Sequence, residues 1–251
     1  SKYYLEKGRG KSKLHKWFYE QEATRFRSFE NVLNQANLIL TMSPNDYANY
    51  SLKFKQKVHY LPSFHSESTY SVPEGTGHYC LFHAKLDKKI NHESAMFLIE
   101  HVFNELPFNL IIAGNGAHKA LRKTIQDYSN VQLIENLTGD DIRKLVKEAQ
   151  VNCIPAIRTT GMKHFLLHLF FNGRYIVTSE NELEGMGFDG LFESAKNPYE
   201  WQTKISELMS RPLQEQEFEA RYNQLNLHYN NRFNASVLYS LILEDKPIDM
   251  G

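Results

Sequence analysis

The sequence VNCIPAIRTTGMKHFLLHLFFNGRYIVTS occupies residues 151–179 and decides the fold. Residues 151–154 form an apolar run followed by proline, which predicts a short buried strand. A helix is expected to start at Gly161, and Gly173 ends it before a second buried strand at 175–178. This order of strand, polar loop, helix and strand is typical of a parallel crossover unit.

The loop before this expected helix combines hydroxyl caps, a glycine and a cation. Thr160 and Gly161 precede the helix, and Lys163 lies in its first turn. A helix N-terminus already carries partial positive charge and free N–H groups, so a lysine there is best explained by an anion bound between them. The sequence therefore predicts a phosphate site. An ordinary crossover helix with a solvated lysine is the alternative.

The same alternation continues through the preceding residues. Strands are expected at 78–83, 108–113 and 131–134, and helices at 92–104, 117–129 and 138–149. Strands separated by helices of this length predict an α/β fold with a doubly wound parallel sheet, whose ligands lie at the carboxyl ends of the strands. Outside the sheet we expect a helix at 15–35, strands at 37–42 and 58–62, a capped helix from Ser43, a linker at 63–77 and a helical tail at 198–243.

The composition sets the class of protein. The chain has 251 residues, is 41% hydrophobic and balances 29 Lys and Arg against 29 Asp and Glu. This predicts a soluble protein with no nucleic-acid partner. Cys80 and Cys153 lie in apolar runs without zinc-ligand spacing, so they are expected to be core residues in a reducing compartment. Without a membrane span or signal-peptide pattern, we expect a cytoplasmic protein, and peripheral association with the inner face of the cytoplasmic membrane stays open.

Residues 113–119, AGNGAHK, follow an expected strand and open a helix, and Glu135 ends the next strand. This imitates a dinucleotide fingerprint, but Lys119 stands where the third glycine belongs, which disfavours a nicotinamide site. We expect Gly114 and Gly116 to let the chain pass close to a ligand, and a simple strand-to-helix turn is the alternative.

Two other patterns carry weaker signals. His164 and His168 are four residues apart, as a metal pair would be, but no third ligand is near them, which favours ordinary core or surface histidines. Lysines 85, 88 and 89 follow the first strand of the sheet and form either a phosphate-facing loop or an exposed one. No Walker loop or Gly-x-Ser-x-Gly motif supports a nucleoside triphosphatase or hydrolase.

Five segments taken together resemble the retaining glycosyltransferases of family 4, which have the GT-B fold. They are LFHAKL at 81–86, NHESA at 91–95, IIAGNG at 111–116, NVQLI at 130–134 and TGMKHFLL at 160–167. The likeness is greatest to bacterial enzymes that make capsule, O-antigen or other surface glycans. It implies a partial acceptor-side domain and linker at 1–72, a nucleotide-sugar donor domain at 73–228 and a crossing helix and tail at 229–251. It also implies that much of the acceptor domain is absent.

The resemblance further implies roles for individual residues. Lys85 and Lys163, with the backbone N–H groups of Gly161 and Met162, would stabilise the departing diphosphate. The other donor-binding residues would be Ala84, Gly114, Gly116, Ile134, Glu135, Leu137, Thr160 and His168, with the base beside 134–137 and His168 at the ribose.

The chain departs from the family at two places. Two glutamates eight residues apart are usual in the family, and here their positions hold Thr160 and His168. An arginine and a lysine that contact the diphosphate are also usual. Lys85 stands at the first of these positions, and the second falls on Ile90, or on Lys89 if the alignment slips.

The implied reaction is transfer of a hexosyl unit from a nucleotide-diphosphate sugar to a glycan or lipid-linked acceptor, with retention and without a required metal or other cofactor. Two alternatives remain. One is a catalytically degenerate GT-B-like protein that binds a nucleotide, which the missing glutamates favour. The other is a sugar-nucleotide epimerase, which shares this architecture.

Overall fold

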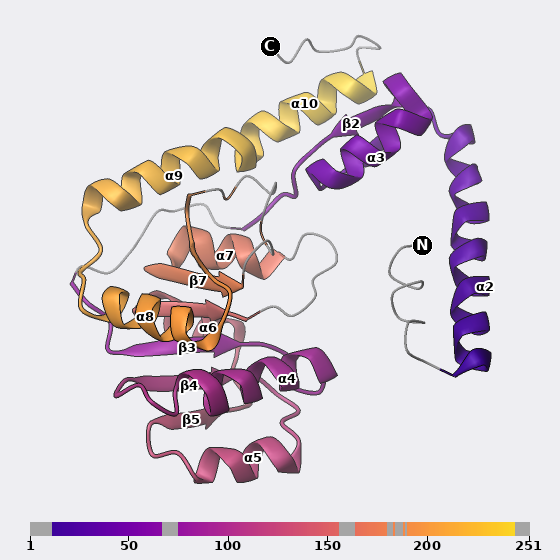
Figure 1. The fold of residues 1–251 in the computed structure, drawn as a ribbon. Coiled ribbons are helices and arrows are strands. Elements are labelled where there is room, and N and C mark those ends of the chain that lie inside the picture. The colour runs from indigo at the N-terminus through magenta and orange to yellow at the C-terminus, as the bar shows by residue number, and fades with distance from the viewer. Residues whose placement is uncertain are drawn as a thin grey trace. The chain divides into compact units, whose positions relative to one another are not determined.

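The computed structural model describes residues 12–66, 75–155, 164–179, 183, 188 and 190–243, and of residues 164 and 165 only the backbone. Figure 1 shows the course of the chain. Contacts divide it into two compact units, which are described separately. Unit 1 comprises Ser1–Pro62 and Arg232–Gly251, and unit 2 comprises Ser63–Asn231.

Unit 2 alternates strands and helices. In chain order its elements are β3 (Tyr79–His83), α4 (Lys89–Phe97), a π-helical segment (Leu98–Val102), β4 (Asn109–Ala113), α5 (Lys119–Gln126), β5 (Val131–Ile134), α6 (Gly139–Glu148), β6 (Val151–Ile154), α7 (His164–Asn172), β7 (Tyr175–Ser179), β8 (Glu193–Ala195), α8 (Pro198–Met209) and α9 (Glu215–Tyr229).

The strands form one parallel sheet in the order β5-β4-β3-β6-β7-β8, as Figure 1 shows for β5 to β7. The chain builds outward from β3 through β4 to β5 and then returns to add β6, β7 and β8 on the other side. This reversal makes the sheet doubly wound, so the predicted fold class is confirmed. β8 was not predicted, because Glu-Ser-Ala has neither an apolar run nor an alternating pattern.

Each face of the sheet has its own core. Alternate side chains of β3, such as Cys80 and Phe82, pack with the buried residues of α4, α5 and α8. Leu81, between them, packs on the other face with α6, α7 and α9. Side chains of successive strand residues point to opposite faces, so two buried faces give the continuous apolar strands seen in the sequence. Both cysteines are buried and free, as expected of core residues.

Unit 1 contains a smaller parallel sheet. Its described elements are α2 (Lys13–Phe29), a 3-10 segment (Glu30–Gln35), β1 (Ile39–Thr41), α3 (Pro44–Phe54), a 3-10 turn (Lys55–Lys57), β2 (Val58–Tyr60) and α10 (Asn231–Leu243). β1 pairs with β2, and α3 connects them. The Ser43 hydroxyl accepts a hydrogen bond from the Asp46 N–H at 3.1 Å, which is the predicted helix cap.

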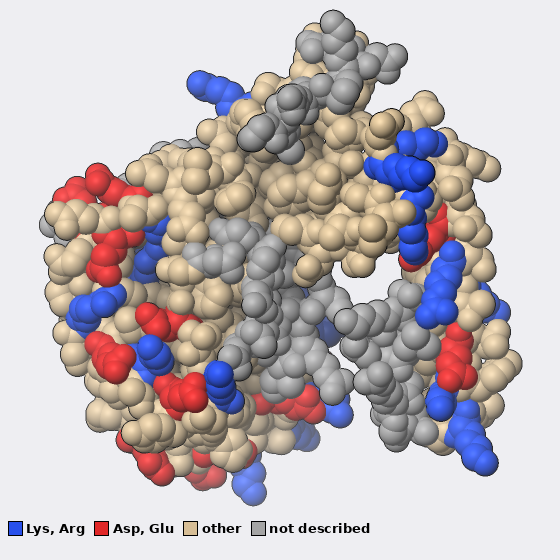
Figure 2. Space-filling model, turned by 45° about the horizontal axis from the view of Figure 1, so that its top comes forward, with Lys and Arg blue, Asp and Glu red and all other residues tan. Residues whose placement is uncertain are grey.

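Charges of both signs are interspersed on the face of the molecule shown in Figure 2, in keeping with a net charge of zero. None of the helices in the described ranges combines the length and apolarity needed to span a lipid bilayer.

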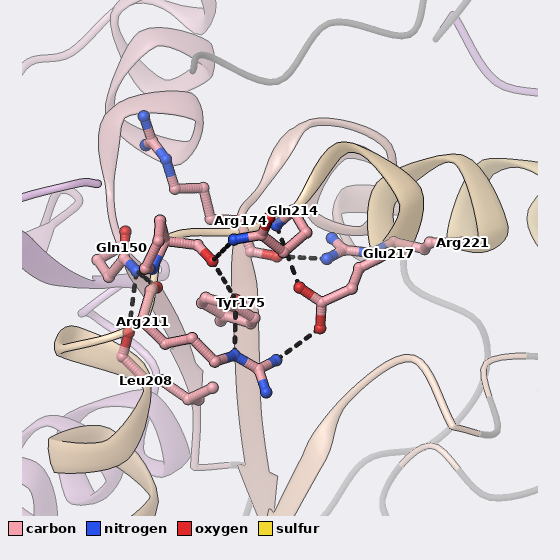
Figure 3. Close-up of polar contacts among 9 residues, drawn as sticks. Gln150, Arg174, Tyr175, Leu208, Arg211, Gln214, Glu217 and Arg221 are labelled. Atoms are coloured by element: carbon pink, nitrogen blue, oxygen red, sulfur yellow. Dashed lines mark hydrogen bonds and ion pairs between the residues drawn. The ribbon is translucent and has the colours of Figure 1, made fainter. Parts of the chain in front are cut away.

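The amino ends of β6 and β7 are fixed by buried polar side chains (Figure 3). The guanidinium group of Arg174 donates to the carbonyls of Lys147, Glu148 and Ala149, at 2.8, 2.9 and 3.3 Å. These carbonyls lie at the carboxyl end of α6, where a helix leaves such groups without intrahelical partners. Arg174 is therefore the cap of α6, supplied from the start of β7.

A second buried side chain, Gln150, ties three other segments together at this edge. Its amide oxygen accepts from the Gly77 N–H at 2.6 Å, and its amide nitrogen donates to the carbonyls of Leu208 and Arg211. Arg221 of α9 donates to the carbonyls of Gly173 and Arg174. The side chains of Gln150, Arg174 and Arg221 are thus paired with backbone groups at this edge of the sheet, although the Nε of Arg174 is buried without a hydrogen-bond partner among the described residues. Pairing of this kind stabilises polar side chains in a core.

We predict that Arg174→Met lowers the free energy of unfolding by about 2–3 kcal/mol, because the carbonyls at the end of α6 lose a charged donor in a buried place. Urea denaturation measures the effect. Arg143→Met is the control, since Arg143 lies on the exposed side of the same helix and pairs with Asp140 there. Its loss should cost about 0.5 kcal/mol or less. Equal losses in the two variants would contradict the capping role of Arg174.

Candidate functional site

A cavity of about 740 Å³ opens at the carboxyl ends of β3, β4 and β6. It lies beside the point where the strand order reverses between β3 and β6, which is where open parallel sheets bind their ligands. Its wall is made chiefly by the loop after β3, the loop after β4, the end of β6 and apolar side chains of α6 and α7. The residues that line it are Leu81, Phe82, His83, Ala84, Lys85, Asp87, Lys88, Ile90, Asn91, Ser94, Gly114, Asn115, Gly116, Leu137, Ile142, Asn152, Cys153, Ile154, Pro155 and Leu169.

Glycines allow the loops after β3 and β4 to pass close to each other. A Cβ atom on Gly114 would lie 1.8 Å from the carbonyl oxygen of Ala84, and one on Gly116 would lie 2.8 Å from the Asp87 Cβ. Gly114 and Gly116 also have φ angles of 149° and 86°, which other residues rarely adopt. Their close neighbour is therefore the chain itself, and both glycines also line the cavity.

Lys85 is the cation best placed to meet an anion in this cavity. Lys88 also lines the wall, but its ammonium group lies 3.5 Å from the carboxylate of Asp87. Lys89 pairs with Glu93 and is not part of the wall, whereas Ile90 is. Among the described residues no ion pair involves Lys85. Ile90 thus places an aliphatic side chain in the wall at the position where the family resemblance implies a lysine.

The N-terminus of α4 points its partial positive charge at the same region. α4 starts at Lys89, and among the described residues no side chain caps its first turn. Uncapped N–H groups at a helix start are suited to hold an anion. The Asn91 amide donates instead to the Lys85 carbonyl at 2.8 Å, so it fixes the backbone that carries Lys85.

Two polar residues of the wall were not predicted from the sequence. Ser94 is buried in α4 and donates its hydroxyl hydrogen to the Pro155 carbonyl at 2.7 Å, which ties α4 to the end of β6. His83 ends β3 and contributes a titratable ring. Burial lowers the pKa of His83, and the charge of His168 lowers it further. His83 lies in the segment LFHAKL and Ser94 in NHESA, and a single histidine or serine in such a segment gives no local signal of a cavity.

The predicted site residues fall into three groups. Ala84, Lys85, Gly114, Gly116 and Leu137 line the cavity. Ile134, Glu135 and His168 do not, and the His168 ring nitrogen Nδ1 instead lies 3.1 Å from the Asn172 amide. Thr160, Gly161, Met162 and Lys163 lie outside the described residues.

Glu135 has contacts that explain its place beside the cavity. Its carboxylate forms an ion pair with Arg122 and accepts a hydrogen bond from the Ala117 N–H at 3.4 Å. Glu135 therefore links the loop after β5 to the loop after β4. The described part of the chain contains no cluster of three or more His, Cys, Asp or Glu residues able to hold a metal ion.

Searches against models of known protein families and against curated proteins found no match. Solved structures do match. S. aureus TarM, in a complex with UDP, has a TM-score of 0.66 at 14% identity over 83% of this chain. HepE from Anabaena, in complex with UDP, has a TM-score of 0.68 at 13% identity over 87% of this chain. This chain has the GT-B glycosyltransferase fold. A glycosyltransferase from Rickettsia africae also matches, with a TM-score of 0.62, 14% identity and 87% of this chain covered.

The GT-B likeness covers most of this chain and a smaller share of each matched structure. The match spans 44% of TarM, 67% of HepE and 68% of the Rickettsia africae protein. The chain therefore spans less than half the length of TarM. At identities of 14% or lower, the likeness shows the fold, and the activity is argued separately below.

We predict that Gly114→Ala lowers the free energy of unfolding by about 2–4 kcal/mol, because the new Cβ would meet the Ala84 carbonyl and the backbone would be strained. Chemical denaturation measures the loss. Gly139→Ala is the control, since the nearest atoms to its Cβ are 3.8 Å away on the Arg143 side chain. A Gly114→Ala variant as stable as the control would show that the two loops do not pass so closely.

We predict that stability falls as the pH drops below about 6.5, the usual pKa of histidine. His83 has a lowered pKa in the folded state, so the unfolded chain binds more protons in this range and acid favours unfolding. His83→Gln should make the dependence of unfolding free energy on pH less steep between pH 7 and 5. His15→Gln, at an exposed histidine of α2, is the control for the loss of a histidine outside the cavity. Parallel slopes for wild type and His83→Gln would contradict the assignment.

Proposed function

We propose that the cavity of unit 2 binds a nucleotide-diphosphate sugar and that the protein transfers the hexosyl unit to an acceptor hydroxyl. The observation that carries this proposal is the position of the cavity, at the strand reversal of a GT-B fold with Lys85 and the uncapped start of α4 in or beside its wall. TarM and HepE were solved in complexes with UDP, and HepE also with UDP-glucose. Uridine nucleotides are therefore the first ligands to test.

In this proposal the diphosphate lies against Lys85, and the base lies towards Leu137 in the loop after β5. The bond between the sugar C1 and the diphosphate oxygen breaks, and its electron pair leaves with the diphosphate. Lys85 stabilises the charge that develops there, since a fixed cation in a partly enclosed site acts more strongly than one in water. Lys163 and the N–H groups of Gly161 and Met162 have the same proposed role.

The acceptor oxygen forms the new bond to C1 with retention and gives up its proton to the departing diphosphate. We propose a glycan or lipid-linked acceptor, as in bacterial surface glycan synthesis, and an enzyme acting in the cytoplasm or at the inner face of its membrane. No cofactor other than the donor substrate is part of this proposal.

A second candidate is binding of the nucleotide sugar without transfer. His168 takes the place of a family glutamate but does not line the cavity, and Thr160 takes the place of the other. In addition, the chain spans 44% of TarM. For this chain alone we therefore expect donor binding with little transfer, and activity in a protein that also supplies the acceptor side.

We predict that UDP binds the protein in the absence of added metal, and that Lys85→Gln weakens binding about ten- to hundredfold. The reason is the loss of one charge-assisted contact to a phosphate. Isothermal titration calorimetry measures the affinity. Lys89→Gln is the matched control, because Lys89 pairs with Glu93 outside the cavity, and it should bind UDP within about twofold of wild type.

Three outcomes separate the candidates. Hydrolysis of UDP-sugars or transfer to an added acceptor supports the enzyme. Binding without turnover supports the second candidate only if it persists in a protein that also supplies the acceptor side. Conversion of one UDP-sugar into another without acceptor would identify an epimerase instead. If UDP and the other nucleoside diphosphates all fail to bind, the proposed function is wrong.

A further inference from the structure

The loop after β4 lies between the loop after β3 and the loop after β5, and Asn115 is bonded to both. Its backbone carbonyl accepts a hydrogen bond from the Leu86 N–H at 2.9 Å. Its side-chain oxygen Oδ1 accepts one from the Asn136 N–H at 2.6 Å. Asn115 also lines the cavity. One residue thus holds the loop that carries Lys85 on one side and the loop that carries Leu137 on the other.

The bond to Asn136 acts at a backbone position with an unusual conformation. Asn136 has a φ of 59°, in the left-handed region that few residues other than glycine and asparagine adopt. In this conformation its N–H points to the Asn115 side chain, and the next residue, Leu137, places its side chain in the cavity wall. An acceptor at residue 115 therefore holds the backbone immediately before Leu137, whose side chain also packs against the core.

The other described polar contacts of the loop after β5 hold residues 135 and 138, on either side of Asn136 and Leu137. Glu135 is held by Arg122 and by the Ala117 N–H. On the far side of Leu137, Thr138 and Asp141 form a capping box at the start of α6. Residues 136 and 137 lie between these two anchors. The Leu137 side chain packs against the core on the α6 and α7 face, and the bond from Asn136 to the Asn115 side chain ties the backbone before it to the loop after β4.

We propose that Asn115 is a positioning residue for nucleobase selection: its Oδ1 fixes residues 136 and 137 at a set distance from the Lys85 loop, so that base and diphosphate are bound together. This inference rests on the proposed binding of a nucleoside diphosphate in the cavity. Asn115 does not need to touch the base. Its effect is to keep the loop after β5, which would contact the base, ordered before the ligand binds. Binding then does not carry the entropy cost of ordering this loop.

The test compares the affinities of UDP, GDP, ADP, TDP and CDP for wild type, Asn115→Ala and Asn115→Asp. Asn115→Ala removes the acceptor, so the ratio of affinities between the preferred base and the others should fall about three- to tenfold, the range expected for one lost hydrogen bond. Asn115→Asp retains an acceptor oxygen. It should keep this ratio within about twofold, although its negative charge weakens the binding of every diphosphate.

Two further measurements separate positioning from general damage. Lys85→Gln should weaken all the diphosphates and leave the ratio between bases unchanged. Hydrogen exchange of the unliganded protein should show a faster Asn136 amide in Asn115→Ala and an unchanged one in Asn115→Asp, since only the first variant loses the acceptor.

The outcomes are distinct. If wild type selects a base and Asn115→Ala selects it equally well, the positioning role is wrong while nucleotide binding stands. The role is also wrong if Asn115→Asp loses the selection as fully as Asn115→Ala. If wild type binds no nucleoside diphosphate, the proposed function fails and this inference fails with it.

Discussion

The burial of a parallel sheet on both faces is the constraint on which the rest of the structure depends. Helices cover both sides of the sheet, so the buried residues of β3 to β7 are mostly apolar. Asn152 and Thr178 are buried polar exceptions, and each donates a hydrogen bond to a backbone carbonyl. Most of the polar chemistry lies at the two edges where strands begin and end. The strand pairs of unit 2 are parallel, which brings the carboxyl ends of β3, β4 and β6 to one edge of the sheet. Because the chain reverses its direction of growth beside β3, the helices diverge there and leave the cavity.

The two edges treat their polar groups in opposite ways. At the amino edge, Arg174, Gln150 and Arg221 use buried donors to satisfy carbonyl groups, and Figure 3 shows this for Gln150 and Arg221. At the carboxyl edge, the start of α4 has no described side-chain cap and Lys85 has no described ion pair. The first arrangement stabilises the fold. The second leaves charge available to a ligand, and free energy that capping would add to stability is available for binding instead.

The sequence predicted the sheet better than the site, for a physical reason. Strands and helices are visible as runs and periods of apolar residues, so β3 to β7 and the covering helices were anticipated, and β8 was missed because three residues without a pattern carry no such signal. A cavity depends on which side chains of distant elements meet. His168 stands eight residues after Thr160, at the position of a family glutamate, but it does not line the cavity. Ser94 and His83 line the cavity, and no sequence pattern around them indicates it.

Glycines and arginines illustrate the same limit. Gly114 and Gly116 suggested close approach to a ligand, and the structure shows that the loop after β3 is itself the close neighbour. Arg174 follows Gly173 in the sequence, at the end of the crossover unit that carries the expected phosphate site, but it lies at the opposite edge of the sheet and caps α6. In both cases the residue type indicated a special contact. The partner in that contact is determined by how the helices and strands pack, which the sequence does not show.

The charge of the cavity wall explains why the arrangement of loops matters as much as any single cation. The charged residues of the wall are Lys85, Lys88 and Asp87. The wall therefore has a formal charge of +1 when His83 is neutral, which it is above its lowered pKa. A diphosphate carries more negative charge than this. The start of α4 supplies part of the difference, and in the sequence Arg158 and Lys163 follow β6.

With so few charges on the described wall, affinity depends on holding base and diphosphate at once, and that requires the loops after β3 and β5 to keep a fixed separation. The loop after β4, which lies between them and bonds to both, sets that separation.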